Sequence, residues 1–298
     1  MTKGGIGLAE TRFAAIRARL ERFSPRPGWR AWLYEFLLFG FKQGWACLFG
    51  GLMLALLLGT HLWYPPGAGL ARYDFLTLAA LAIQLAMLAM RLETLDEAKV
   101  ILAFHVVGTV MELFKTAAGS WLYPEPSLLR IGAVPLFSGF MYGAVGSYIA
   151  RVWRIFDFRY SFYPPRWATV VLAIAIYVNF FAHHWLVDVR WMLFAGIALL
   201  FARTRIWFRV WQEDRWMPLM LGWLLVALFI WLAENVGTFS NAWLYPDQRA
   251  GWHLVSPGKL GAWYLLMYIS FVLVGLVHGI GQRAKDLAGE AGLPTSAA

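Results

Sequence analysis

A glutamate surrounded by apolar residues occurs twice in this chain, within two stretches that are nearly the same. The first stretch, MELFKTAAGSWLYPE, begins at Met111, and the second, AENVGTFSNAWLYPD, begins at Ala233. Glu112 of the first stretch corresponds to Glu234 of the second, 122 residues later. A carboxylate in apolar surroundings can donate or accept a proton, and inside a membrane such a residue is costly and usually functional. The pair therefore predicts acid–base chemistry.

The polar residues near Glu112 share one face of a predicted helix. His105 and Thr109 precede Glu112 by seven and three residues, and Thr116 follows it by four. These spacings bring all four side chains to the same side of a helix, which we expect to face the interior of a helix bundle. The architectural alternative is that Glu112 pairs only with Lys115, one turn further on.

The second stretch repeats the outer part of this face, where Thr238 and Asn241 follow Glu234. Here the architectural alternative is that Glu234 caps loop amides. The candidates for proton transfer are Glu112, Glu234, His105 and Lys115. The candidates for substrate binding are Thr109, Thr116, Thr238, Asn241, Trp121, Tyr123, Trp243, Tyr245, Tyr142, Tyr264, His61 and His183.

Cofactor chemistry has no support in the sequence. The chain has six histidines and lacks H-E-x-x-H, so we expect no metal site. The motifs G-x-x-x-x-G-K-[ST], G-x-G-x-x-G and G-x-S-x-G are also absent, which argues against ATP, dinucleotides and serine hydrolysis. Cys47 is the single cysteine, so no intramolecular disulfide can form.

The elements that position these residues are predicted to be membrane helices. Of the 298 residues, 60% are hydrophobic and 14% are charged, against about a quarter charged in soluble domains. Eight apolar segments approach the ~20 residues that cross a bilayer. They are 44–63, 75–91, 100–118, 136–156, 168–186, 190–204, 216–236 and 260–281. We therefore predict an all-α polytopic membrane protein.

The 122-residue offset extends beyond the two glutamates and predicts a duplication. It also relates His61 to His183 and Tyr142 to Tyr264. Spans one, three and four then superpose on five, seven and eight, as in a duplicated four-helix unit. Because four is even, the two copies have the same orientation, a 4+4 parallel repeat. The predicted divisions are a basic segment 1–43, repeats 44–165 and 166–284, and a disordered tail 285–298.

Positive charge alternates between the predicted loops and sets the topology. Eight Lys or Arg precede the first span, and the loops after spans four and six are also rich in arginine. This is the positive-inside pattern, so both termini are expected in the cytoplasm and the net charge of +9 does not indicate nucleic acid. Residues 8–23 have Phe13, Ile16, Leu20 and Phe23 on one helical face. They are expected to lie on the anionic leaflet or to form a solvated tail.

Two resemblances accompany these motifs. Across RLETLDEAKVILAFHVVGTVMELFKTAAGSWLYPE and WLAENVGTFSNAWLYPDQ, the chain resembles the YoaT-like family of bacterial integral membrane proteins, from about residue 33 to 282. That resemblance implies the bacterial inner membrane but no activity. The order E-x-x-x-T-x-x-G-x-x-x-Y, followed by GAVP at 132–135, resembles membrane carotenoid hydratases and lycopene cyclases. This second resemblance implies metal-free protonation of a polyene by Glu112, and by Glu234 through the repeat.

Three functions remain open from the sequence. The first is a cofactor-independent acid–base enzyme acting on an apolar isoprenoid or lipid, with Glu112 as the acid and Glu234 stabilising or deprotonating a cation. The second is a proton-coupled transporter or channel, and the third is a non-catalytic membrane assembly factor. Membrane lipids are the expected partners, and no oligomeric state is predicted. We also expect the two glutamates to face one shared outer cavity, with Pro124 and Pro246 stopping their helices.

Overall fold

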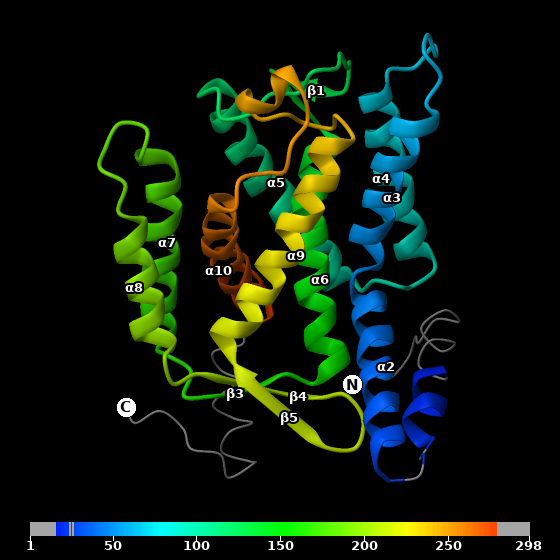
Figure 1. Ribbon diagram of the computed structural model, residues 1–298, viewed down its shortest axis with the longest axis vertical. Coiled ribbons are helices and arrows are strands. Elements are labelled where there is room, and N and C mark those ends of the chain that lie inside the picture. The colour runs from blue at the N-terminus through cyan, green and yellow to red at the C-terminus, as the bar shows by residue number, and fades with distance from the viewer. Residues whose placement is uncertain (1–15, 24, 26, 279–298) are drawn as a thin grey trace. The chain divides into compact units, whose positions relative to one another are not determined.

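The computed structural model describes residues 16–23, 25 and 27–278, and most of them are helical (Figure 1). The expected disordered tail, the end of the last span and Phe13 lie outside these residues. The chain forms two compact units. The first consists of Met1–Thr116, Glu125–Phe156 and Arg209–Asp214. The second consists of Ala117–Pro124, Asp157–Phe208 and Arg215–Ala298.

The first unit is built around helix α6. Its helices are α2 (Trp29–Ala46), α3 (Leu48–Trp63), α4 (Arg72–Ala89), α5 (Leu95–Ala117) and α6 (Phe137–Phe156). Helices α2, α3 and α4 all pack against α6. A short ribbon precedes α6, in which β1 (Arg130–Ile131) pairs antiparallel with β2 (Val134–Pro135).

Small residues on α6 allow α5 to approach it closely. A Cβ added at Gly139, Gly143 or Gly146 would lie within 3 Å of side-chain atoms of His105, Ile101 or Phe104 respectively. In membrane proteins such small residues let helix backbones approach and increase packing contacts. The α5–α6 contact therefore depends on glycine at these three positions.

The second unit contains α7 (Arg166–Ala182), α8 (Arg190–Phe201), α9 (Leu219–Phe239), the 3-10 helix η1 (Pro246–Ala250) and α10 (Gly258–His278). Helix α10 packs against α9 and α7, and α8 lies beside α7 (Figure 1). Aromatic rings fill the core, where the Trp223 ring centroid lies 4.9 Å from that of Phe201 and 5.3 Å from that of Tyr268. Edge-to-face arrangements of this kind add to the stabilisation that burial provides.

The expectation of an all-α protein is corrected by five short strands. Besides β1 and β2, the strands β3 (Arg159–Ser161), β4 (Arg205–Arg209) and β5 (Asp214–Pro218) form one sheet in the order β3-β4-β5. Tyr160 of β3 lies opposite Ile206 of β4 in antiparallel register. The stretch 205–211, RIWFRVW, is rich in aromatic and β-branched residues, a composition that favours strands.

The structure supports fewer membrane-spanning helices than the eight segments expected. Among the described residues, α4, α5, α9 and α10 are long and apolar enough to cross a membrane. A fifth candidate is the pair α2 and α3, which is bent by 69° at the break between them. Helices α7 and α8 have only 17 and 12 residues. The chain is therefore a mostly helical protein with four or five candidate spans.

The first expected span, 44–63, covers α3 but only the end of α2. Helix α2 begins earlier, at Trp29. Its charged residue Lys42 does not interrupt the helix and is only 1% exposed. The Lys42 ammonium donates to Glu21 Oε1 at 2.7 Å and to the carbonyl oxygen of Val210 at 2.6 Å. A buried lysine with two acceptors is tolerated within an apolar helix.

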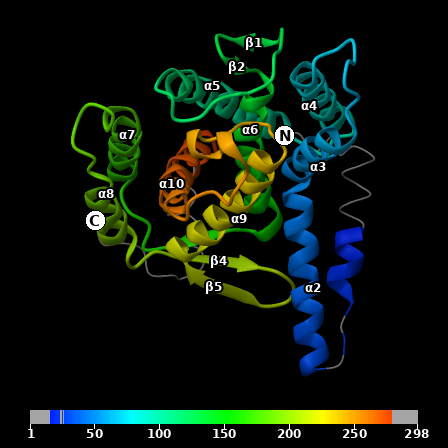
Figure 2. The same ribbon diagram turned by 45° about the horizontal axis from the view of Figure 1, so that its top comes forward.

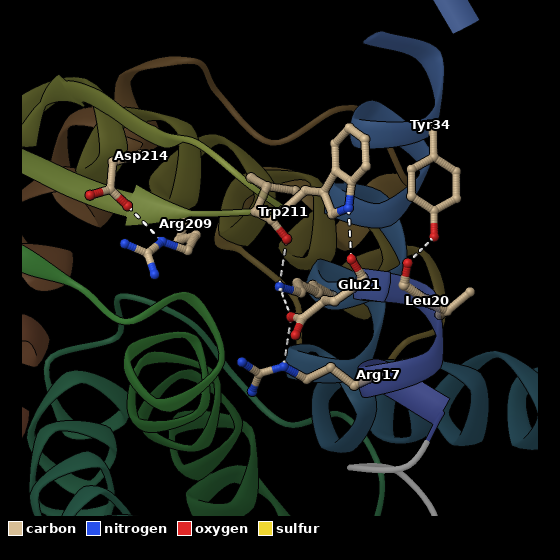
Figure 3. Close-up of polar contacts among 9 residues, drawn as sticks. Arg17, Leu20, Glu21, Tyr34, Arg209, Trp211 and Asp214 are labelled. Atoms are coloured by element: carbon tan, nitrogen blue, oxygen red, sulfur yellow. Dashed lines mark hydrogen bonds and ion pairs between the residues drawn. The ribbon is translucent and has the colours of Figure 1, made fainter. Parts of the chain in front are cut away.

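These contacts attach the short helix 16–22 to α2 and to the loop between β4 and β5 (Figures 2 and 3). The indole of Trp211 donates to the Glu21 carbonyl oxygen at 2.9 Å, and the Tyr34 hydroxyl donates to the Leu20 carbonyl oxygen. Arg17 also donates to the Glu21 carboxylate at 2.9 Å. Glu21 therefore holds three elements of the first unit together.

We expect acidification to release this contact. Burial alone would raise the pKa of Glu21, but hydrogen bonds from Lys42 and Arg17 outweigh it and hold the pKa below its ordinary value. Because the folded pKa is the lower one, the contribution is present above the unfolded pKa of about 4.3 and is lost as pH falls through the folded value. The protection of the amides of residues 16–23 against hydrogen exchange, relative to the intrinsic rate at each pH, should fall below about pH 4. Glu21→Gln should remove that pH dependence, and an unchanged profile in this variant would contradict the assignment.

Candidate functional site

Glu112 lies buried on α5, with 4% of its surface exposed. The hydroxyl of Tyr142, on α6, donates a hydrogen bond of 2.8 Å to Glu112 Oε1. The Tyr142 ring occupies the space left by the missing side chain of Gly108, since a Cβ at that position would lie 2.5 Å from the ring. A buried carboxyl group with a phenol as partner can hold or release a proton, provided that a proton acceptor reaches it.

The neighbours of Glu112 on its helix face have local roles. Thr109 donates to the His105 carbonyl oxygen at 2.7 Å, and Thr116 donates to the Glu112 carbonyl oxygen at 2.6 Å. Threonines bound in this way satisfy their hydroxyl hydrogens within the helix. Lys115 is buried, with 4% of its surface exposed, on the same helix.

His105 is not brought to Glu112. Its ring lies against Gly139 and 4.9 Å from the ring centroid of Phe140, both on α6. The seven residues that separate His105 from Glu112 correspond to ~10 Å along a helix. Direct proton exchange between the two side chains therefore has no support in this geometry.

Glu234 is equally buried, at 4% exposure, on α9. The Tyr245 hydroxyl donates to Glu234 Oε1, and the Trp263 indole donates to Oε2 at 2.5 Å. The Lys259 ammonium lies 4.1 Å from the centroid of the Tyr245 ring. Donors on both oxygens and a nearby cation suit an ionised carboxylate, because an indole N–H can only donate.

The alternative that Glu234 caps loop amides is wrong, because the hydrogen bonds that its carboxylate accepts come from the side chains of Tyr245 and Trp263. The adjacent residue, Asn235, binds the loop instead: its Oδ1 accepts from the amide of Val255 at 2.8 Å. Thr238 accepts from the indole of Trp252 at 3.1 Å. The sequence did not single out Asn235, which follows Glu234 on α9, or Trp263 and Lys259, which only the fold brings to this site.

The structure also places the remaining candidates between residues 241 and 264. Asn241 has a positive φ of 54° just after the end of α9, a conformation that asparagine tolerates well. The Trp243 ring fills the space beside Gly237, where an added Cβ would lie 2.1 Å from it. Tyr264 packs against Phe194, with ring centroids 5.9 Å apart.

The two WLYP motifs meet inside the second unit. Leu122 and Leu244 exchange backbone hydrogen bonds, both of 2.9 Å, in an isolated antiparallel bridge. Each residue is the repeat equivalent of the other, so a local two-fold relation passes between them. The Trp121 ring also lies edge-on to Tyr245, with centroids 6.3 Å apart. Residues of the first motif thus support the tyrosine that binds Glu234, while Tyr123 is partly exposed beside them.

The two histidines of the repeat lie at helix ends. His61 is in the last turn of α3. His183 ends α7, where its Nδ1 lies 3.0 Å from the Asn179 carbonyl oxygen and its ring lies 4.3 Å from that of His184. Among the described residues, no group of three or more His, Cys, Asp or Glu side chains could hold a metal ion.

Asp74 is a buried carboxylate that the sequence analysis missed. It is 1% exposed in the first turn of α4 and accepts hydrogen bonds from the amides of Leu128 and Leu129 at 2.7–3.0 Å. It therefore anchors the loop that leads into α6. An aspartate in an apolar helix was the available signal, but its partners lie more than 50 positions away.

Comparison with known proteins identifies the family. The family described as "Protein of unknown function (DUF817)" matches residues 35–271. The chain belongs to the DUF817 family. This confirms the YoaT-like resemblance, since this DUF817 protein is 42% identical over 250 residues to "Uncharacterized protein YoaT" of Bacillus subtilis (strain 168). The match covers 84% of this chain and 94% of that relative.

This DUF817 protein also has a distant structural neighbour. Crystal structures of MvINS, a mycobacterial Insig homolog from Mycobacterium vanbaalenii, match at a TM-score of 0.43 and 14% identity. One of them is a cross-linked trimer. The match covers 64% of this chain and 97% of that one.

Proposed function

We propose that this DUF817 protein is a cofactor-independent acid–base enzyme that acts on an apolar isoprenoid or lipid within the bacterial inner membrane. The observation that carries the proposal is the pair of buried glutamates, each hydrogen-bonded to an aromatic hydroxyl: Tyr142 for Glu112 and Tyr245 for Glu234. Carboxyl groups held in apolar surroundings are costly and are retained where protons or cations are handled.

The two glutamates have different proposed roles. Glu112, whose Oε1 accepts from Tyr142, donates its proton to a carbon–carbon double bond and leaves a tertiary carbocation. Water then adds to the cation and returns one proton, or a neighbouring carbon loses a proton. The net reaction is hydration or isomerisation, with no oxidant. Glu234 receives donors on both oxygens, and its proposed role is that of an ionised carboxylate that stabilises positive charge.

A duplicated architecture is part of this proposal. The ends of α5 and α9, Ala117 and Phe239, are separated by the same 122 residues as Glu112 and Glu234. The exchange of hydrogen bonds between Leu122 and Leu244 also supports a two-fold relation. We infer that α3–α6 and α7–α10 are the two copies of a 4+4 repeat. The distribution of arginines supports cytoplasmic termini.

The test is expression in cells that accumulate lycopene or a related polyene, with extracted pigments separated by chromatography. We expect a new hydrated or isomerised product with the native chain. Glu112→Gln should lower its formation by about 10²–10⁴-fold, because general acid catalysis typically contributes this much. The control is Glu213→Gln, an exposed carboxylate in the loop between β4 and β5, which should leave the product unchanged. An unaltered pigment profile with the native chain across several polyenes would overturn the proposal.

A second candidate, proton-coupled transport, is favoured by the bent pair α2 and α3. Transporters commonly use helices interrupted at the binding site, and this pair is bent by 69° at Cys47. The same variants distinguish the two functions in proteoliposomes. Proton-linked flux that is lost in the double variant Glu112→Gln, Glu234→Gln, without polyene turnover in the native chain, would favour transport over catalysis.

A further inference from the structure

A second buried polar centre lies in the first unit, where α4 ends, α5 begins and α6 ends. Glu93 and Arg151 form an ion pair with Oε1 and Nη2 3.0 Å apart, and neither side chain has any exposed surface. Glu93 also accepts hydrogen bonds from the Gln84 amide and from Ser147 Oγ, the latter at 2.9 Å. Glu93 therefore has an arginine counter-charge and two further hydrogen-bond donors within this centre.

The pair is connected to the break between α2 and α3. Arg151 Nη1 donates to the carbonyl oxygen of Trp45 at 3.3 Å, in the last turn of α2. A cation that binds the last carbonyl groups of a helix stabilises its C-terminal end. The bend at Cys47 is therefore fixed by Arg151, and Arg151 is neutralised by Glu93.

Two polar atoms of this centre remain without a protein partner among the described residues. They are Gln84 Oε1, which can accept a hydrogen bond, and Arg151 Nε, which must donate one. Both belong to buried side chains, Gln84 being 8% exposed and Arg151 0%. Buried polar groups in native proteins are almost always satisfied, and internal water commonly satisfies those that the protein does not.

We propose that the centre around the Glu93–Arg151 pair binds internal water, which donates to Gln84 Oε1 and accepts from Arg151 Nε. Water fits the two atoms because it is both donor and acceptor, whereas a cation would be repelled by Arg151 and an anion by Glu93. The water makes the ion pair a hydrated charge centre beside the α2–α3 break. This site is independent of the proposed reaction at Glu112.

The first test is X-ray footprinting of the full chain in lipid nanodiscs. X-rays split internal water into hydroxyl radicals, which oxidise the side chains next to it. Hydroxyl radicals formed in bulk water do not reach a buried residue. Met87 and Met53 are a matched pair, since both lie in one apolar cluster at 3% and 0% exposure. Met87 is joined to the centre through its backbone, because its carbonyl oxygen accepts from the amides of Leu92 and Glu93.

We expect Met87 to be oxidised several-fold faster than Met53, and Gln84→Leu to bring the two rates together. Equal slow rates in the native chain, or an unchanged Met87 rate in Gln84→Leu, would overturn the proposal. If Gln84→Leu does not fold, a structure that resolves ordered water decides the question. Water density within hydrogen-bond distance of Gln84 Oε1 and of Arg151 Nε supports the site, and protein groups bound to both atoms refute it.

Discussion

Arg151→Met is expected to lower the free energy of unfolding by about 3–5 kcal/mol, because it leaves Glu93 as a fully buried charge without its counter-charge. Methionine replaces the aliphatic part of arginine but cannot donate to Glu93 or to the Trp45 carbonyl oxygen. The measurement is reversible unfolding of the purified protein in mixed micelles, followed by far-ultraviolet circular dichroism as the fraction of denaturing detergent rises.

A double variant separates the cost of the unpaired charge from the cost of lost packing. Glu93→Leu combined with Arg151→Met removes both charges, and we expect it to recover most of the stability, since apolar pairs often replace buried ion pairs without loss. The control is Arg209→Met, whose side chain is 51% exposed in its pair with Asp214 and which should cost no more than about 1 kcal/mol. Equal effects of Arg151→Met and Arg209→Met would contradict the assignment.

The sequence predicted the class of the protein and the long helices well, because both follow from local patterns. Apolar length alone located α4, α5, α9 and α10, which the structure gives as candidate spans. The same criterion failed at α2, since the charge of Lys42 is neutralised by Glu21, 21 positions earlier in the chain. It also overlooked the sheet of β3, β4 and β5, where pairing joins segments separated by more than 40 residues.

The prolines illustrate a similar limit. Pro124 and Pro246 were expected to stop the two helices, but α5 and α9 already end at Ala117 and Phe239. Pro246 instead occupies the first position of η1, where its fixed φ and missing amide proton are favourable. The local sequence indicated that the helices do not continue through the prolines, but not that a new helix, η1, begins at Pro246.

Partners of the buried carboxylates were less predictable than the carboxylates themselves. Glu112 and Glu234 were singled out because a carboxylate in an apolar segment is energetically costly, and both are buried. Tyr142 and Tyr245 were named as candidates for substrate binding, whereas each donates to a glutamate. Arg151 was counted only as a topological charge. A charge on α6 gives no local sign that Glu93, 58 positions earlier, neutralises it.

Gly108→Ala is expected to destabilise the protein by about 2–3 kcal/mol, although alanine is the better helix former by about 1 kcal/mol. The new Cβ would lie 2.5–2.8 Å from three atoms of Tyr142, so the tyrosine must move. Its hydroxyl then leaves Glu112, and a buried carboxyl group that loses its partner costs about 1–3 kcal/mol.

The control for this prediction is Gly51→Ala in α3, where no other atom lies within 4 Å of the added Cβ. We expect it to stabilise the protein by up to about 1 kcal/mol, so the two substitutions should have opposite signs in the same unfolding assay. Combining Gly108→Ala with Tyr142→Ala relieves the overlap, and the two effects should therefore sum to more than the double variant shows. If the effects of the two single variants add up to that of the double variant, Gly108 does not position Tyr142. Other contacts of α6 would then hold the Tyr142 hydroxyl near Glu112.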